Sequence, residues 1–217
     1  MIECLALGGY ALYKLLSAGP ASKGIPAPVA TVPRRIITFV GRTGVGKSST
    51  ANALLRRPAF VTSAAHGTTT SIADRPYRHG FVIRDTPGSM DDVSYLPLVW
   101  PALEESAVVV YTTAGQLYRV ELEFLQVLHA RQRAWDRGMS HRKLLLYVNQ
   151  VDTREGTMPK ALRDREEAVI KAQVSPWISP DKVAFGAASP KKDGREQLPR
   201  VDSLEVLLEG LILQYQP

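Results

Sequence analysis

The expected architecture depends on the octapeptide Gly41-Arg42-Thr43-Gly44-Val45-Gly46-Lys47-Ser48, which fits the pattern G-x-x-x-x-G-K-[ST]. It lies between the apolar run 36–40, a predicted strand, and residues 47–57, a predicted helix. Glycines let the backbone curl so that successive N–H groups face a phosphate, and the helix N-terminus adds its positive end. We therefore expect Lys47 to reach the terminal phosphates of a nucleotide and Ser48 to ligate Mg²⁺.

From Arg35 onward, short β-rich runs alternate with longer helical ones. Strands are expected at 36–40, 71–77, 81–84, 107–113, 143–149 and 182–186, and helices at 47–57, 117–134, 159–174 and 203–214. A tight turn at 78–80 makes the second and third strands a hairpin. This order of strand, helix, hairpin and three strand–helix repeats predicts one α/β domain with a mostly parallel sheet.

Composition limits the alternatives for the whole chain. The 217 residues are 45% hydrophobic and 22% charged, which excludes disorder and a multi-span membrane protein as overall descriptions. The only cysteine, Cys4, excludes an intramolecular disulfide and suits a reducing compartment, so we expect a cytoplasmic location. The net charge of +6 could favour RNA or lipid, but it is spread along the chain. We expect no specific nucleic-acid partner.

The N-terminal part differs in composition from the rest. Residues 2–16 are mostly apolar but interrupted by Glu3, Gly8-Gly9 and Lys14, and they are too short and too charged for a typical spanning helix. Three interpretations stay open: a helix docked on the domain, an interfacial anchor that contacts a membrane, and the remnant of a membrane segment. Residues 17–34 predict a Pro/Ala-rich linker, which leaves 35–217 as the folded domain.

Two further motifs follow expected strands. Asp85-Thr86-Pro87-Gly88 fits D-x-x-G, whose carboxylate can hold Mg²⁺ through water and whose glycine N–H can bind a γ-phosphate; an ordinary Asp-Pro-Gly turn is the alternative. Asn149-Gln150-Val151-Asp152 is similar to the guanine-reading N-K-x-D motif, with Gln150 in the lysine position. Adenine would leave the Asp152 carboxylate unpaired, so this motif favours GTP over ATP.

With these motifs in order, residues 35–216 resemble the Ras-like GTPase superfamily and, within it, the Era-like and septin-like branches. D-T-P-G, with its proline, is similar to Era-type GTPases. The segment GRTGVGKSS, which ends at Ser49, is similar to loops of septin-like, chloroplast-import and immunity-related GTPases. The resemblance implies a three-layer G domain with a six-stranded sheet, one strand of which is antiparallel.

The resemblance also implies further site residues. Thr69, in the segment His66-Gly67-Thr68-Thr69-Thr70, matches the switch threonine that joins Mg²⁺ and the γ-phosphate, with Thr68 as the second choice. Ala187, in Gly186-Ala187-Ala188, matches the residue whose backbone N–H faces the guanine O6. The implied catalytic residues are Lys47, Thr69 and Gly88, and the implied metal ligands are Ser48, Thr69 and Asp85. The nucleotide would contact Gly41, Arg42, Thr43, Gly44, Val45, Gly46, Lys47, Ser48, Ser49, Thr69, Asp85, Gly88, Asn149, Gln150, Asp152 and Ala187.

The implied activity is Mg²⁺-dependent hydrolysis of GTP to GDP and phosphate by a molecular switch. Ser89 stands where a Ras-type enzyme carries the glutamine that positions water, so we expect slow intrinsic hydrolysis. A partner, or a second copy across the nucleotide face, would accelerate it. The alternative function is a nucleotide-dependent module for assembly or membrane docking that has little turnover.

Overall fold

The computed structural model describes residues 34–62, 71–88, 93–136, 142–155, 157–192 and 195–215. The predicted helix at 1–16, residues 17–33 of the predicted linker, and Thr69 lie outside the described residues. Arg34, which the sequence assigned to the linker, is already the first residue of the first strand, β1. The three predicted interpretations of residues 2–16 therefore stay predictions.

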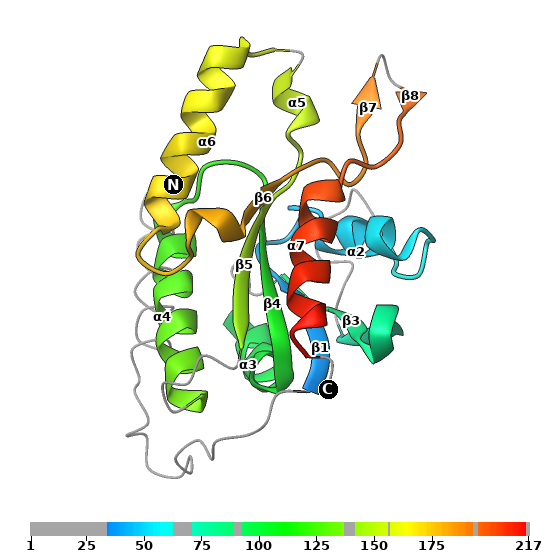
Figure 1. Cartoon of the computed structure of the whole chain (residues 1–217), viewed down its shortest axis with the longest axis vertical. Helices are drawn as coiled ribbons and strands as arrows, with labels where there is room; N and C mark the ends of the chain where they lie inside the picture. Colours follow the sequence, from blue (N-terminus) through cyan, green and yellow to red (C-terminus); the bar gives the residue numbers. More distant parts are fainter. Residues whose placement is uncertain are drawn as a thin grey trace.

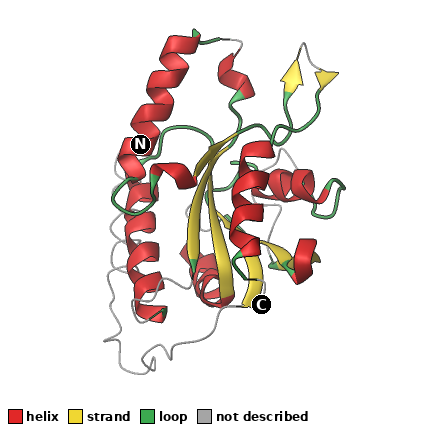
Figure 2. Ribbon diagram, in the orientation of Figure 1, coloured by secondary structure: helices red, strands yellow, loops and turns green. Residues whose placement is uncertain are grey.

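A six-stranded sheet occupies the middle of the described fold, as predicted (Figures 1 and 2). Its strands are β1 (Arg34–Val40), β2 (Ala73–Pro76), β3 (Val82–Asp85), β4 (Ser106–Thr113), β5 (Lys143–Val148) and β6 (Val183–Phe185). Their spatial order is β2-β3-β1-β4-β5-β6, and only the β2–β3 pairing is antiparallel. The carboxyl ends of the five parallel strands therefore share one edge of the sheet.

Helices cover both faces of this sheet. They are α2 (Lys47–Leu55), α3 (Leu96–Glu105), α4 (Arg119–Trp135), α5 (Asp152–Glu155), α6 (Lys160–Val174) and α7 (Asp202–Leu213), with 3₁₀ turns at Arg78–Gly80, Val93–Tyr95 and Pro180–Lys182. Apolar residues of α3, α4 and α6 form the core on one face, and those of α2 and α7 form the core on the other. Every residue of β4 is buried, because this central strand is covered on both faces.

Apart from 3₁₀ turns, three elements were missed by the sequence prediction. One is α3, which contains Pro97 in its first turn and Pro101 in its interior, where proline disfavours a helix. Its apolar residues nevertheless follow a helical spacing and are fully buried: Leu96, Val99 and Leu103. The others are the single-turn helix α5, which follows β5, and the short hairpin of β7 (Lys191–Lys192) and β8 (Arg195–Glu196), which follows β6.

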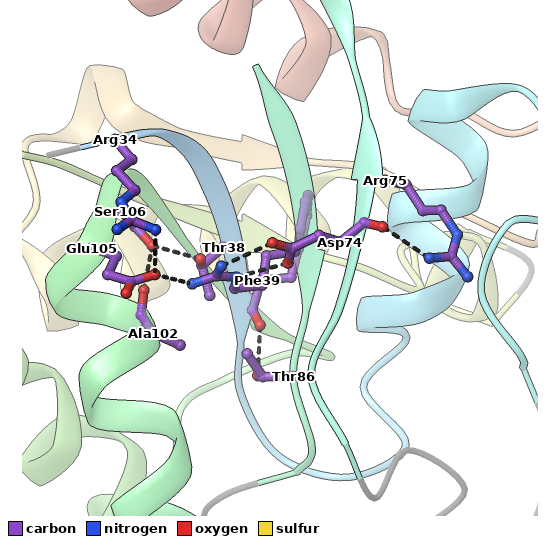
Figure 3. Close-up of polar contacts among 10 residues, drawn as sticks. Arg34, Thr38, Phe39, Asp74, Arg75, Thr86, Ala102, Glu105 and Ser106 are labelled. Carbon is purple, nitrogen blue, oxygen red and sulfur yellow. Dashed lines mark hydrogen bonds and ion pairs between the residues drawn. The ribbon is translucent and has the colours of Figure 1, made fainter. Parts of the chain in front are cut away.

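Charged side chains fix the position of β3. The Arg84 guanidinium binds both carboxylate oxygens of Asp74 on β2, at 2.7 and 2.8 Å, and a carboxylate oxygen of Glu105 at the end of α3, at 3.0 Å. Arg34 lies 3.9 Å from the same Glu105 carboxylate (Figure 3). These contacts tie β3 to β1, β2 and α3, so the residue after Arg84, Asp85, is held at the carboxyl end of its strand.

Candidate nucleotide-binding site

The loop between β1 and α2 has the conformation that the octapeptide predicts. Gly46 is the residue before the first turn of α2 and has a φ of 91°, in the left-handed region that favours glycine. A Cβ atom at this position would lie 2.2 Å from Nδ2 of Asn149, so no larger residue fits. The loop thus leads directly into a helix N-terminus, where unpaired N–H groups and the helix dipole favour an anion.

The Lys47 side chain folds back across this loop. Its ammonium donates to the carbonyl oxygens of Gly41, at 3.1 Å, and Arg42, at 2.8 Å, and the residue is 6% exposed. The positive charge is therefore held beside the loop, where it can meet a phosphate. Ser49 lies next to Ser48 in the first turn of α2 and is half-buried.

Ser48 and Asp85, the two predicted magnesium ligands within the described residues, lie side by side. The Ser48 hydroxyl, at the start of α2, donates to Asp85 Oδ2 at 2.5 Å. Asp85 is 1% exposed, and the next residue, Thr86, donates its hydroxyl to the carbonyl of Phe39 at 2.7 Å (Figure 3). A hydroxyl and a carboxylate oxygen are the hard ligands that Mg²⁺ prefers, so this donor set fits the ion.

The end of the D-T-P-G motif packs against the loop. A Cβ atom at Gly88 would lie 2.0 Å from Oγ1 of Thr43 and 2.7 Å from its backbone nitrogen. Only glycine allows this close approach. Gly88 is therefore next to the phosphate loop, although it is 47 residues from Gly41 in the sequence.

Asn149 joins three loops at the same edge of the sheet. It is 3% exposed; its Nδ2 donates to the carbonyl of Val45 at 2.9 Å, and its Oδ1 accepts from the N–H of Ala188 at 2.9 Å. The asparagine thereby links the phosphate loop, the loop after β5 and the loop after β6. Its side chain uses one donor and its acceptor within the protein, so its role here is to position these loops.

The rest of the predicted guanine-reading segment lies beside Asn149. Gln150 has a φ of 60° and donates from Nε2 to the carbonyl of Gly44 at 3.2 Å, so it also contacts the phosphate loop. Asp152 is the first residue of α5. The N–H of Ala187 donates to the carbonyl of Arg200 at 3.0 Å, so donation from Ala187 to a guanine would require this bond to break.

The Arg42 side chain points to α4. Its guanidinium lies 4.9 Å from the centre of the Tyr118 ring, a cation–π contact. Glu121, 1% exposed, accepts from the N–H of Tyr118 at 2.9 Å and from the hydroxyls of Tyr111 and Thr113, both at 3.2 Å. Burial raises the pKa of Glu121, although these bonds and Arg42 act in the opposite direction.

Arg42, Tyr118 and Glu121 border a cavity of about 610 Å³ that is also lined by Thr43, Gly44 and Val45 of the phosphate loop. Tyr118 and Glu121 were absent from the sequence interpretation. Tyr118 precedes the first residue of α4 and Glu121 follows three positions later, which is the spacing of a capping box. The signal was hidden because tyrosine is not a usual residue at the cap position.

Comparison with known proteins is consistent with this geometry. The family model described as 50S ribosome-binding GTPase matches residues 36–150, which is more than half of the chain. The chain belongs to this family of P-loop GTPases. The matched region runs from β1 through the phosphate loop, Asp85 and Gly88 to Gln150, so it contains most of the site described above.

Two relatives in sequence are bacterial GTPases or GTP-binding proteins. The chain is 26% identical over 181 residues to the GTPase Der of Pelodictyon phaeoclathratiforme, a match that covers 77% of this chain and 38% of Der. It is 45% identical over 62 residues to the probable GTP-binding protein EngB of Gemmatimonas aurantiaca, covering 28% of this chain and 29% of EngB. The chain thus spans well under two thirds of the length of either relative.

Two solved structures share the fold. A variant of Era from Aquifex aeolicus bound to GDP and aluminium fluoride superimposes with a TM-score of 0.57 at 17% identity, over 84% of this chain and 56% of that one. Era in complex with MgGDPNP and a segment of 16S ribosomal RNA gives a TM-score of 0.53 at 16% identity, with the same coverage. At this identity the likeness supports the G-domain fold alone.

Among the described residues, no helix has the length and apolar character needed to cross a membrane.

Proposed function

We propose that this chain binds GTP and GDP at residues 41–49 and hydrolyses GTP as a molecular switch. The observation that carries the proposal is the 2.5 Å contact between the Ser48 hydroxyl and the Asp85 carboxylate. This contact joins the phosphate loop to the D-x-x-G motif beside the helix N-terminus and the Lys47 ammonium. A nucleotide with its phosphates at that point would meet a positive charge, backbone donors and oxygen ligands for a metal together.

Within the family, we propose that the chain belongs to the Era-like or septin-like branch. The proline of D-T-P-G and the sequence of the phosphate loop support this assignment. The fold shared with Era is compatible with it. No RNA is assigned to this chain, because the match covers only 56% of the RNA-bound Era chain.

Ser48, Asp85 and Thr69 would hold Mg²⁺ in the proposed site. When bound, the ion neutralises phosphate charge and orients the β- and γ-phosphates. Lys47 would release its carbonyl partners and bind the terminal phosphates, and the N–H of Gly88 would donate to the γ-phosphate. Lys47, Thr69 and Gly88 are therefore the proposed catalytic residues.

The proposed intrinsic rate follows from two other residues. Ser89 is too short to position water as a glutamine does, and Arg42 is engaged with Tyr118. We therefore propose a slow intrinsic rate.

Acceleration of GTP hydrolysis is proposed to come from a protein partner or from a second copy that pairs across the nucleotide face.

A cytoplasmic location in a reducing compartment, with membrane contact through residues 2–16, is also a proposal. It is based on the single cysteine and the apolar N-terminal run. The alternative function, assembly or membrane docking with little turnover, is less well supported, because the relative whose match covers 77% of this chain is named as a GTPase.

Competition binding tests the proposed ligand. GTP, GDP, ATP and XTP each compete with a fluorescent guanine nucleotide for binding to the wild type, Lys47→Ala and Asp152→Asn. GTP should bind the wild type at least about a hundredfold more tightly than ATP, because adenine lacks the two donors that Asp152 accepts, at about 1.5–3 kcal/mol each. Asp152→Asn should favour XTP, and Lys47→Ala should lose both GTP and GDP.

Glu155→Gln is the matched control, since Glu155 is an acidic residue of the same short helix that binds Arg200 instead of the site. This variant should keep the wild-type ranking of nucleotides. Equal competition by ATP and GTP in the wild type, or an unchanged ranking in Asp152→Asn, would contradict the guanine assignment. Unchanged GTP affinity in a folded Lys47→Ala protein would contradict the phosphate site.

A further inference from the structure

The outer side of α7 presents apolar residues to solvent. Val206 and Leu213 are 67% and 57% exposed, and Gly210 lies between them with open space beyond its Cα. Residues seven positions apart share one side of a helix, so Val206, Gly210 and Leu213 form a stripe, here called the α7 stripe. The opposite side of α7 is buried against the sheet through Leu204, Leu208, Leu211 and Ile212. A helix that is apolar on both sides is typical of one covered on both sides.

The described chain begins beside one end of the α7 stripe. The Arg35 guanidinium, at the start of β1, donates to the carbonyl of Tyr215 at 3.1 Å, just after the end of α7. Figure 1 shows the start of β1 close to the C-terminal end of α7. Any segment that precedes Arg34 therefore leaves the domain near Leu213.

The spacing of residues 2–16 suits such a position. In a helix, Glu3 and Lys14 would lie only about 20° apart, because they are eleven positions apart at 100° per residue. Leu5 and Leu12 would lie about opposite these charges, on an apolar face. A helix of 15 residues measures about 22 Å, and α7, with 12 residues, measures about 18 Å. Residues 17–33 can span up to roughly 55–60 Å, enough to bring this face onto α7.

We propose that residues 2–16 dock as an amphipathic helix on the α7 stripe of the same chain, with the Leu5 and Leu12 face toward Val206 and Leu213. The docked segment shields the apolar side of α7 and keeps the Leu5 and Leu12 face of the N-terminal run out of water. The charges of Glu3 and Lys14 stay on the solvent side. This proposal is independent of the proposed nucleotide chemistry, since α7 lies outside the phosphate loop.

The natural cysteine Cys4 lies within this segment, so disulfide trapping in the full chain tests the contact directly. Val206→Cys and Leu213→Cys each provide a second thiol on the stripe. Leu162→Cys is the matched control, because Leu162 is a similarly exposed apolar residue, at 51%, on the separate helix α6. Under mild oxidation, at least one stripe variant should form the intramolecular disulfide ten or more times faster than the control.

A second substitution separates the two faces of the segment. Leu12→Asp, on the face toward α7, should slow trapping in the faster stripe variant at least fivefold. Tyr10→Asp, which would lie on the same side as Glu3 and Lys14, should leave the rate within twofold. Equal trapping in the stripe and control variants would overturn the proposal. Disulfide-linked dimers in place of the intramolecular product would also overturn it and assign the stripe to a second copy. Uniform rates together with flotation on phosphatidylglycerol vesicles would assign the segment to a membrane instead.

Discussion

Replacing Asn149 with alanine should destabilise the domain more than a typical substitution. The side chain makes two buried hydrogen bonds of 2.9 Å, one to the carbonyl of Val45 and one from the N–H of Ala188. Alanine would leave both backbone groups unpaired in the interior. Each unpaired buried group costs about 1–3 kcal/mol, so the free energy of unfolding should fall by about 2–6 kcal/mol. This is a large part of the 5–15 kcal/mol typical of a domain.

Urea denaturation of the nucleotide-free protein measures this loss. With a slope of about 2 kcal/mol per molar, the unfolding midpoint of Asn149→Ala should fall by about 1–3 M. Asn149→Asp should lose at least as much, because it keeps the acceptor for Ala188 but places a carboxylate oxygen against the Val45 carbonyl. A loss below about 0.5 kcal/mol in Asn149→Ala would refute the reasoning, since the two bonds would then contribute nothing to the fold.

A matched asparagine separates stability from ligand binding. Asn52, on α2, also joins its helix to a loop: it accepts from the N–H groups of Ala59 and Phe60 and donates to the carbonyl of Phe60. Asn52→Ala should therefore lose stability while it keeps its affinity for GTP. Asn149→Ala should lose both, because it releases the phosphate loop. Equal effects of the two substitutions on affinity would show that Asn149 acts only through global stability.

Three further substitutions test other buried polar groups. Burial raises the pKa of Tyr147, so its contribution to stability is present below pH 10 and is lost as the pH rises above that value; Tyr147→Phe should reduce this loss in urea midpoints measured between pH 8 and 11. Its hydroxyl has no hydrogen-bond partner among the described residues, so the same variant should be no less stable than wild type at pH 7. Arg142→Met should lower the free energy of unfolding by about 3–5 kcal/mol, because it leaves the Asp136 carboxylate buried without its positive partner, with the backbone N–H of residue 142 still donating to it. Arg84→Met should cost less, about 1–3 kcal/mol by the same measurement, since its partner Asp74 is partly exposed and can recover water.

The strands next to the site could be predicted because local sequence is enough to specify them. Residues 107–113 and 143–148 are continuous apolar runs, and short runs of this kind are typical of strands that are covered on both faces. The octapeptide likewise specifies its own loop conformation, since Gly46 must adopt a left-handed backbone conformation before the helix begins. The helix α3 could not be predicted in the same way. Its two prolines weaken the helical signal, and the helix is stabilised by the burial of Leu96, Val99 and Leu103 against the rest of the core.

The contacts that organise the site depend on long-range packing, so no local pattern predicts them. The N-Q-V-D motif suggested a base-reading role for Asn149, but its side chain is used to hold Val45 and Ala188 in place. The proposed base-reading role consequently rests on Asp152. Gln150 adds a contact of the same kind, because its amide reaches the carbonyl of Gly44. A lysine there could also donate to that carbonyl, so glutamine in the lysine position of the motif preserves the link between the two loops while it lacks a positive charge beside the proposed base site. It follows that Gln150→Lys should tighten GTP binding through charge while GTP keeps the same advantage over ATP, because selectivity depends on the Asp152 carboxylate. A change of that advantage in the competition assay would mean that Gln150 itself reads the base.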